Sequence, residues 1–167
     1  MYTTKLAQIE NIQEIIEIAR QTWPKTYQNI LSQGQISYML DLMYNVDTIA
    51  AQMDNGVRFV VIVDKNKTFG FISYENLALN ESEPYTKVHK LYVHPDYHGK
   101  GAGKKLIQAA EDAARNANIQ YLQLNVNKHN KSVDFYLANG FYVKKEMVLE
   151  IGNGYVMDDF VMEKLVK

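Results

Sequence analysis

The sequence predicts one α/β domain spanning residues 1–167, and three observations lead to this prediction. Helical periods alternate with β-rich runs along the whole chain. A buried-strand pattern passes through a glycine-rich turn into a helix at residues 88–105. Finally, 47% of the 167 residues are hydrophobic and 22% are charged, a balance that allows a chain of this length to bury one core.

The N-terminal third is expected to be mainly helical, after a weakly signalled strand over residues 1–7. Apolar residues recur at helical spacing over residues 9–22, and Pro24 follows as a stop signal. A second helix is expected to begin near Ser32, and a shorter third one to cover residues 47–54. The aromatic residues of this region are first of all core candidates.

Two β-rich runs follow at residues 58–64 and 68–74, and the short polar segment between them predicts a hairpin. The polar stretch at residues 75–86 is expected to be a surface loop. No internal repeat or low-complexity segment interrupts this order, which favours a single domain.

The segment 88–105 carries the strongest functional signal. Its apolar run, residues 91–93, suits a strand buried on both faces. Gly99, Gly101 and Gly103 alternate in the loop that follows, so backbone N–H groups can approach an anion with no Cβ in the way. The next helix points its free N–H groups and its positive dipole end at the same spot. A diphosphate should therefore fit this loop.

The glycine spacing excludes two common nucleotide signatures. Walker A needs Gly, four residues, then Gly-Lys-Ser/Thr; counting back from Gly103 gives His98, and Lys105 stands where the hydroxyl should be. A Rossmann fingerprint needs glycines at the first, third and sixth positions, and from Gly99 the sixth is Lys104. Neither pattern describes the loop.

The last third of the chain is expected to hold a strand, a helix and a hairpin. Residues 119–126 show near alternation, and residues 132–139 form a short helix that Gly140 ends as a C′ residue. Residues 141–150 and 155–165 make the final hairpin around two glycines.

The glycine loop resembles the acetyl-CoA loop of the GNAT superfamily of N-acetyltransferases. In that family Arg or Gln, two residues, Gly, one residue, and Gly or Ala follow a buried strand. Here the matching residues are His98, Gly101 and Gly103, so histidine replaces the usual Arg or Gln. This departure leaves the backbone cradle intact but puts a role for the first side chain in doubt.

A second motif strengthens the resemblance. Family members often carry Asn, then a helix bearing Phe-Tyr, then three residues and Gly-Phe, and here these are Asn130, Phe135-Tyr136 and Gly140-Phe141. The element order extends the likeness over nearly the whole chain. It implies a GNAT fold, with a mixed, mostly antiparallel twisted sheet of six to seven strands and helices on both faces. It also implies direct acetyl transfer from acetyl-CoA to a primary amine in a ternary complex.

The family's motifs imply the cofactor-binding residues and the acid. Tyr136 stands where a tyrosine in many members protonates the leaving thiolate of CoA. The backbone groups of Leu91 and Val93 should hold the pantetheine arm, and Asn130 is a plausible contact on the opposite lip. The diphosphate should be bound by the loop, which comprises His98, Gly99, Lys100, Gly101, Ala102, Gly103 and Lys104.

The base is open among three candidates. An alkyl ammonium has no lone pair, and with a pKa of about 10.4 its deprotonation at pH 7 costs about 4.6 kcal/mol. Strand alternation is expected to place His89 on the same face as Leu91 and Val93. His89 matches a position where the arylalkylamine branch of the family has a histidine proposed to pass the proton through water. Glu75 and ordered water are the alternatives.

The acceptor is also open. In GNAT folds the region between the first two strands forms one wall of the acceptor pocket, so Trp23, Tyr27 and Tyr38 are the expected substrate-binding residues. The sequence is similar to the polyamine and small-amine branch, and Asp158 or Asp159 could hold a cationic tail. As neighbours on a strand they point to opposite faces, so one must face away. A peptide or protein amine is the other expectation.

Composition limits the partners. A net charge of -1 gives no positive field to attract nucleic acid. The chain has no cysteine, which excludes thiolate metal sites and a cysteinyl acyl intermediate. No metal is expected. The chain lacks a membrane-length apolar run and a leader, so we expect a cytoplasmic protein without a membrane partner. A homodimer is an expectation from the resemblance, and a catalytically silent CoA-binding regulatory module is the alternative function.

Overall fold

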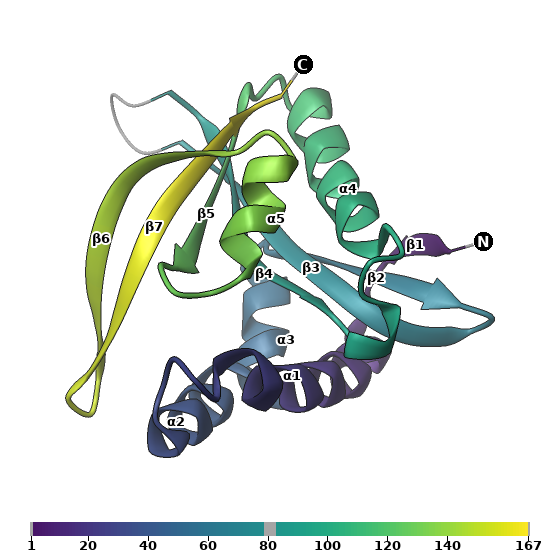
Figure 1. Ribbon diagram of the computed structural model, residues 1–167. Coiled ribbons are helices and arrows are strands. Elements are labelled where there is room, and N and C mark those ends of the chain that lie inside the picture. Colours follow the sequence, from purple (N-terminus) through teal and green to yellow (C-terminus); the bar gives the residue numbers. More distant parts are fainter. Residues whose placement is uncertain (1, 79–82, 167) are drawn as a thin grey trace.

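A seven-stranded mixed sheet forms the centre of the molecule (Figure 1). The computed structural model describes residues 2–78 and 83–166. The strand order is β1-β2-β3-β4-β5-β7-β6, and among the described residues only β4 and β5 pair in parallel. The strands are β1 (Thr3–Leu6), β2 (Arg58–Asp64), β3 (Lys67–Leu77), β4 (Tyr85–Val93), β5 (Tyr121–Asn127), β6 (Tyr142–Gly152) and β7 (Tyr155–Leu165).

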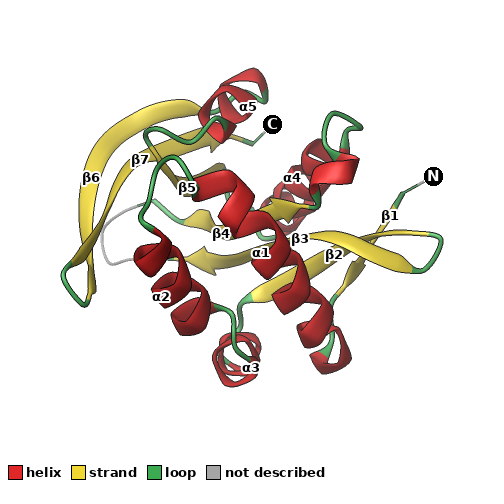
Figure 2. Ribbon diagram, turned by 60° about the horizontal axis from the view of Figure 1, so that its bottom comes forward, coloured by secondary structure: helices red, strands yellow, loops and turns green. Residues whose placement is uncertain are grey.

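Five α-helices cover both faces of this sheet, which confirms the fold class expected from the sequence. Figure 2 shows α1, α2 and α3 in front of the sheet and α4 behind it. Each face buries its own apolar core, because the helices turn one apolar stripe toward the strands. The helices are α1 (Ile12–Tyr27), α2 (Gln33–Met43), α3 (Val46–Asp54), α4 (Ala102–Asn116) and α5 (Ser132–Ala138). None of the helices in the described part of the chain is long and apolar enough to cross a membrane.

The two central strands diverge, and this divergence organises the molecule. β4 and β5 pair over four residues only, from the Tyr85/Tyr121 pair to the Val88/Leu124 pair. Beyond these residues β4 continues beside β3 alone, and β5 continues beside β7 alone. We call the space between the two diverging ends the fork. One arm of the fork leads into the glycine-rich loop before α4.

A β-bulge at His89 corrects the expected strand alternation. In the β3–β4 ladder Tyr74 pairs with Val88 and Ser73 with Lys90, so His89 is an extra residue without a partner. Val88 therefore lies in the same core as Leu91 and Val93, on the α4 side of the sheet. The prediction that His89 shares a face with Leu91 and Val93 was wrong, because the bulge shifts the two-residue period by one.

Two element boundaries also differ from the sequence prediction. Helix α1 runs through Pro24 to Tyr27 instead of ending near Thr22. Pro24 removes one N–H donor, but the orphaned carbonyl would be that of Arg20, an exposed residue whose backbone water can reach. The predicted loop at residues 75–86 starts later, because Glu75 is in β3 and pairs with Lys87. Its central residues 79–82 lie outside the described part of the chain.

Candidate active site

Two glycines of the loop before α4 lie in the left-handed region of backbone conformation. Gly99 and Gly101 adopt positive φ angles of 72° and 80°, and a Cβ built on either would meet nothing within 4 Å. The loop thus leaves open space above its backbone, in front of the first N–H groups of α4. At Gly103 a Cβ would stand 2.9 Å from Phe135 Cζ, so this glycine allows α4 to pack against α5.

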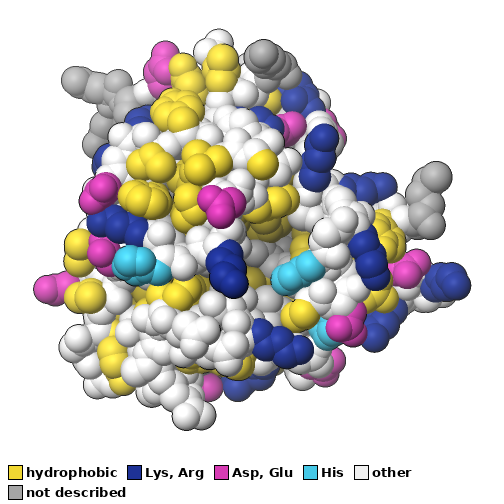
Figure 3. Space-filling model, viewed as in Figure 1, with side chains coloured by type: hydrophobic (Ala, Val, Ile, Leu, Met, Phe, Trp, Pro, Cys, Tyr) yellow, Lys and Arg dark blue, Asp and Glu magenta, His cyan; other side chains and the backbone are white. Residues whose placement is uncertain are grey.

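The loop side chains divide into structural and open groups. His98, the departure from the family pattern, bonds through Nε2 to the carbonyl oxygen of Val93 at 2.7 Å. Lys100 donates to the carbonyl of Asp96 at 2.8 Å, Ala102 is buried and Lys104 is exposed. Lys, Arg and His side chains stand around a hollow in the middle of the face that carries α5 and the start of α4 (Figure 3).

The β4 arm of the fork presents unpaired backbone groups. His94 N–H donates to the carbonyl of Phe69, beyond the end of β4, at 2.7 Å, which fixes the side on which His94 bonds. Backbone groups of an antiparallel strand alternate between its two sides. Tyr92 therefore faces β3 as His94 does, whereas the N–H and C=O groups of Leu91 and the N–H of Val93 point into the fork. The carbonyl of Val93 is on the same side and is bonded by His98 Nε2. These two residues, Leu91 and Val93, are the ones whose backbone groups were predicted from the sequence to hold the pantetheine arm.

Three tyrosines and an asparagine converge at the fork. Tyr136 on α5 is 7% exposed. Its burial raises the pKa of the phenol, and the neighbouring Tyr27 adds a smaller rise. Tyr27, at the end of α1, receives a hydrogen bond of 3.5 Å from Asn130 Nδ2 on the other side of the fork. Burial raises the pKa of Tyr27, and the charge of Asp159 adds to the rise. The hydrogen bonds with Tyr92 and Asn130 lower this pKa but do not cancel the effect of burial. All three phenols therefore keep their protons until a strong base is next to them.

His89 and Glu75, two of the three base candidates, lie together. His89 Nε2 is 2.8 Å from Glu75 Oε1, and the two side chains are 32% and 27% exposed. Burial lowers the pKa of His89, while the hydrogen bond that His89 donates to Glu75 raises it. The imidazole is therefore neutral at pH 7 and able to accept a proton.

Sequence reasoning missed a polar pair beside this dyad. Lys87 bridges the base of the fork, because its Nζ donates to Asn125 Oδ1 on β5. Burial lowers the pKa of Lys87 to about 8, and the nearby Asp159 opposes this fall. The one sequence feature that pointed to this pair was Asn125, a polar residue within the mainly apolar pattern of β5. We call Glu75, Lys87, His89, Asn125 and Asp159 the polar cluster.

The remaining predicted acceptor residues lie in different surroundings. Trp23 is 2% exposed and packs its ring against Tyr27 and Tyr44, with centroids at 4.5 and 5.9 Å. Tyr38 on α2 donates to the carbonyl of Ile151 at 3.0 Å and thereby ties α2 to the β6–β7 hairpin. Tyr27 is the one of the three predicted residues that contacts the fork residue Asn130.

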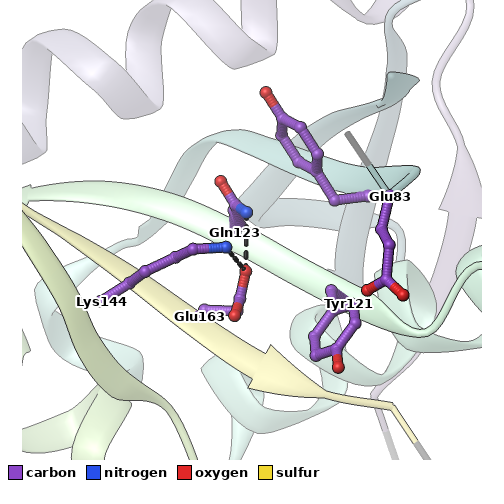
Figure 4. Close-up of a pocket in the computed structure, with 6 residues that line it drawn as sticks. Glu83, Tyr121, Gln123, Lys144 and Glu163 are labelled. Carbon is purple, nitrogen blue, oxygen red and sulfur yellow. Dashed lines mark hydrogen bonds and ion pairs between the residues drawn. The ribbon is translucent and has the colours of Figure 1, made fainter. Parts of the chain in front are cut away.

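A separate pocket of about 340 Å³ lies at the opposite end of the paired strands, beside the first residues of β4 and β5. Lys144 and Gln123 both reach Glu163 there, at 2.5 and 2.7 Å from its Oε2 (Figure 4). Tyr142 donates to the other oxygen. The protein itself satisfies the Glu163 carboxylate with three donors. Across the described residues, no group of His, Cys, Asp and Glu side chains could hold a metal ion.

Comparison with known proteins gives one family. A family model described as an acetyltransferase (GNAT) domain matches residues 28–157. A spermidine N(1)-acetyltransferase of Thermoplasma acidophilum is 30% identical over 162 residues, which cover 93% of this chain and 92% of that protein. An L-amino acid N-acyltransferase of Escherichia coli is 28% identical over 93 residues, which cover 55% of this chain and 54% of that protein.

Solved structures agree with this result. The crystal structure of the PaiA N-acetyltransferase from Thermoplasma acidophilum, in complex with coenzyme A, superposes with a TM-score of 0.81 at 27% identity and covers 99% of both chains. The ribosomal-protein-S18-alanine N-acetyltransferase of Escherichia coli has a TM-score of 0.73 at 15% identity, covering 100% of this chain and 95% of that one. At this lower identity the likeness concerns the fold alone.

Proposed function

The chain belongs to the GNAT acetyltransferase family, and from this premise we propose that it transfers an acetyl group from acetyl-CoA directly to a primary amine, in a ternary complex. The observation that carries the proposal is the fork. One end of it meets a glycine loop with open space above its backbone, and the polar cluster lies on the opposite face of the sheet. We also propose that residues 1–167 act as one domain.

The residues at the loop fit acetyl-CoA. The N–H groups of residues 99–104 would hold the diphosphate, since Gly99 and Gly101 keep that space free of Cβ atoms. The backbone groups of Leu91 and the N–H of Val93 would hold the pantetheine arm as a neighbouring strand would, while the Val93 carbonyl is bonded by His98. Asn130 would contribute from the α5 side. When bound, acetyl-CoA supplies the activated acetyl thioester.

His89 would remove the proton of the acceptor ammonium, directly or through a water molecule. Its neutral imidazole and its hydrogen bond with Glu75 support this role, because the carboxylate orients the ring and stabilises the imidazolium that forms. The ammonium loses one proton to His89, and the freed lone pair forms the new C–N bond while the C–S bond breaks. The nitrogen then loses its second proton to give the neutral amide. Glu75 alone and ordered water remain the alternative bases.

Tyr136 would supply the proton that the departing sulfur needs. It lies on α5 beside the fork, and its high pKa keeps the phenol protonated until a thiolate develops. The second proton lost by the nitrogen replaces, by way of solvent, the proton that Tyr136 gives to sulfur, and the proton taken by His89 leaves to solvent as the net proton of the reaction. No metal takes part in this proposal.

A small alkylamine is the acceptor that we propose, with a polyamine as the first choice. The relative with the longest match of those described above is named for spermidine, and the polar cluster includes two carboxylates able to attract ammonium groups. A peptide N-terminus is the competing acceptor.

The test measures thiol release from acetyl-CoA with spermidine, L-methionine or an alanine-initiated peptide. We expect amine-dependent release that is fastest with spermidine. A melting temperature that rises with acetyl-CoA, combined with no amine-dependent release, would overturn the proposal in favour of a silent CoA-binding module.

A further inference from the structure

Asp159 on β7 is a buried carboxylate that the protein leaves without a donor. The side chain is 6% exposed, and Oδ1 is buried with no hydrogen-bond partner. A buried, unpaired carboxylate is costly, because it has lost its water and gained nothing in return. This arrangement contrasts with Glu163 four residues later, which receives three hydrogen bonds.

The alternation of β7 shows which side of the sheet Asp159 faces. Met157, on the same face by parity, contacts Gln35 of α2, whose Nε2 lies 3.8 Å from its sulfur. The neighbouring residues point the other way: Asp158 pairs with Lys128 at 2.7 Å, and Phe160 packs into the core on the α4 side. Asp159 is therefore the acid that faces the side of α1 and α2.

The surroundings of Asp159 connect it to the reaction. It lies close enough to Lys87 and to Tyr27 to change their pKa values, and Tyr27 in turn affects the pKa of Tyr136. Lys87 is engaged by Asn125, and no salt bridge joins it to Asp159 among the described residues. Asp159 pairs with Asn127, the last residue of β5, on the arm of the fork that lies opposite β4, and its Oδ1 is free to accept.

We propose that Asp159 binds the ammonium group of the acceptor amine at the fork and so selects protonated primary alkylamines as substrates. This inference rests on the proposed function and adds the residue that recognises the acceptor. An ammonium group would donate a hydrogen bond to Oδ1 and would also neutralise the buried charge. An amide or alcohol would donate the hydrogen bond but leave the charge in place. His89 then removes the proton from a nitrogen that Asp159 has already oriented.

The titration of Asp159 gives this role a pH signature. Burial, and then the adjacent Asp158, raise the pKa of Asp159 to about 6, while Lys87 and Lys128 oppose the rise. Tyr27 is a further titratable group that Asp159 affects, and it stays protonated throughout the neutral range. The carboxylate is therefore ionised at pH 7.5, and the KM for the amine should rise as the pH falls through about 6.

The experiment compares Asp159→Asn with Asp158→Asn, a matched control on the opposite face whose partner Lys128 keeps Glu146. Steady-state rates are measured with n-butylamine and with spermidine at saturating acetyl-CoA. For Asp159→Asn we expect the KM for both amines to rise about tenfold to a hundredfold, without the pH dependence near 6 and with kcat within about threefold. Asp158→Asn should stay within about twofold of wild type. The KM for acetyl-CoA should not change in either variant.

An unchanged KM for both amines in Asp159→Asn would overturn the inference. A loss confined to spermidine would overturn it as well, because Asp159 would then hold a distant ammonium and not the one at the fork. Melting temperatures with spermidine alone separate this result from the proposed function. If spermidine stabilises the wild type but not Asp159→Asn, and no thiol is released, the inference stands and the proposed transfer reaction fails.

Discussion

The glycine loop and the polar cluster, the two regions that meet at the fork, are built in different ways. The end that meets the glycine loop consists of consecutive residues and acts mainly through backbone groups, with Gly99 and Gly101 holding the loop open. The polar cluster draws its side chains from β3, β4, β5 and β7, which lie up to about 80 residues apart in sequence. The first end suits a cosubstrate that all family members share, and the second can vary one side chain at a time. Under the proposed function, cosubstrate binding would come from the backbone, and acceptor choice from scattered side chains.

Tyr136 lies where the two regions meet, and its removal is expected to have the largest effect. Tyr136→Phe should lower kcat by about 10² to 10⁴-fold while the melting temperature still rises with acetyl-CoA, because only the proton donor is lost. Tyr142→Phe is the control, since that hydroxyl bonds Glu163 in the distant pocket. Steady-state kinetics with both variants measure the difference. A kcat for Tyr136→Phe equal to that of wild type would remove Tyr136 from the chemistry.

The dyad tests whether the polar cluster contributes chemistry as well as affinity. His89→Gln should lower kcat by about 10²-fold. Glu75→Gln should have a smaller effect of a different kind. The Glu75 carboxylate, which accepts a hydrogen bond from His89, raises the pKa of His89 against burial, so loss of its charge should lower that pKa further. The acid limb of kcat, measured at saturating amine, should then move to lower pH. A limb that stays in place, or moves to higher pH, would argue for ordered water as the base.

The backbone end can be tested with a pair of glycines in the same strained conformation. Gly101 has a φ of 80° and Gly56, after α3, a φ of 95°, and neither has a neighbour within 4 Å of a Cβ. Alanine at either position should cost about 1–2 kcal/mol of stability. Only Gly101→Ala should raise the KM for acetyl-CoA, by about tenfold, because the loop N–H groups would shift. An equal KM in both variants would contradict a phosphate-binding role for the loop.

The smallest effect concerns stability. The pKa of Asp159 in the folded protein is about 6, above the value of about 3.9 expected in the unfolded chain. The stabilising contribution of the carboxyl is therefore complete below about pH 4 and lost as the pH rises through 6. Asp159→Asn should melt several degrees higher than wild type at pH 8 and at nearly the same temperature at pH 4. Thermal unfolding at the two pH values provides the measurement, and a lower melting temperature at pH 8 would contradict the account of an unpaired charge.

Sequence reasoning reached the backbone end and stopped short of the polar cluster. The glycine loop could be identified from the sequence because its glycines and the helix that follows are adjacent in the chain. Helix α1 extends past Pro24 because its end is packed by Trp23 and Tyr27, which local propensity does not register. The neighbourhood of Lys87 and Asp159 depends on which strands lie side by side, and a single sequence does not give strand order.

The unpaired position of His89 bears on how such a site can change over time. Because Val88 and Lys90 already alternate across the ladder without it, removing this one residue would leave every other side chain of β4 on its present face. A single-codon deletion could thus abolish the histidine while sparing the core, and an insertion could restore it. The proposed base is therefore separable from the architecture around it.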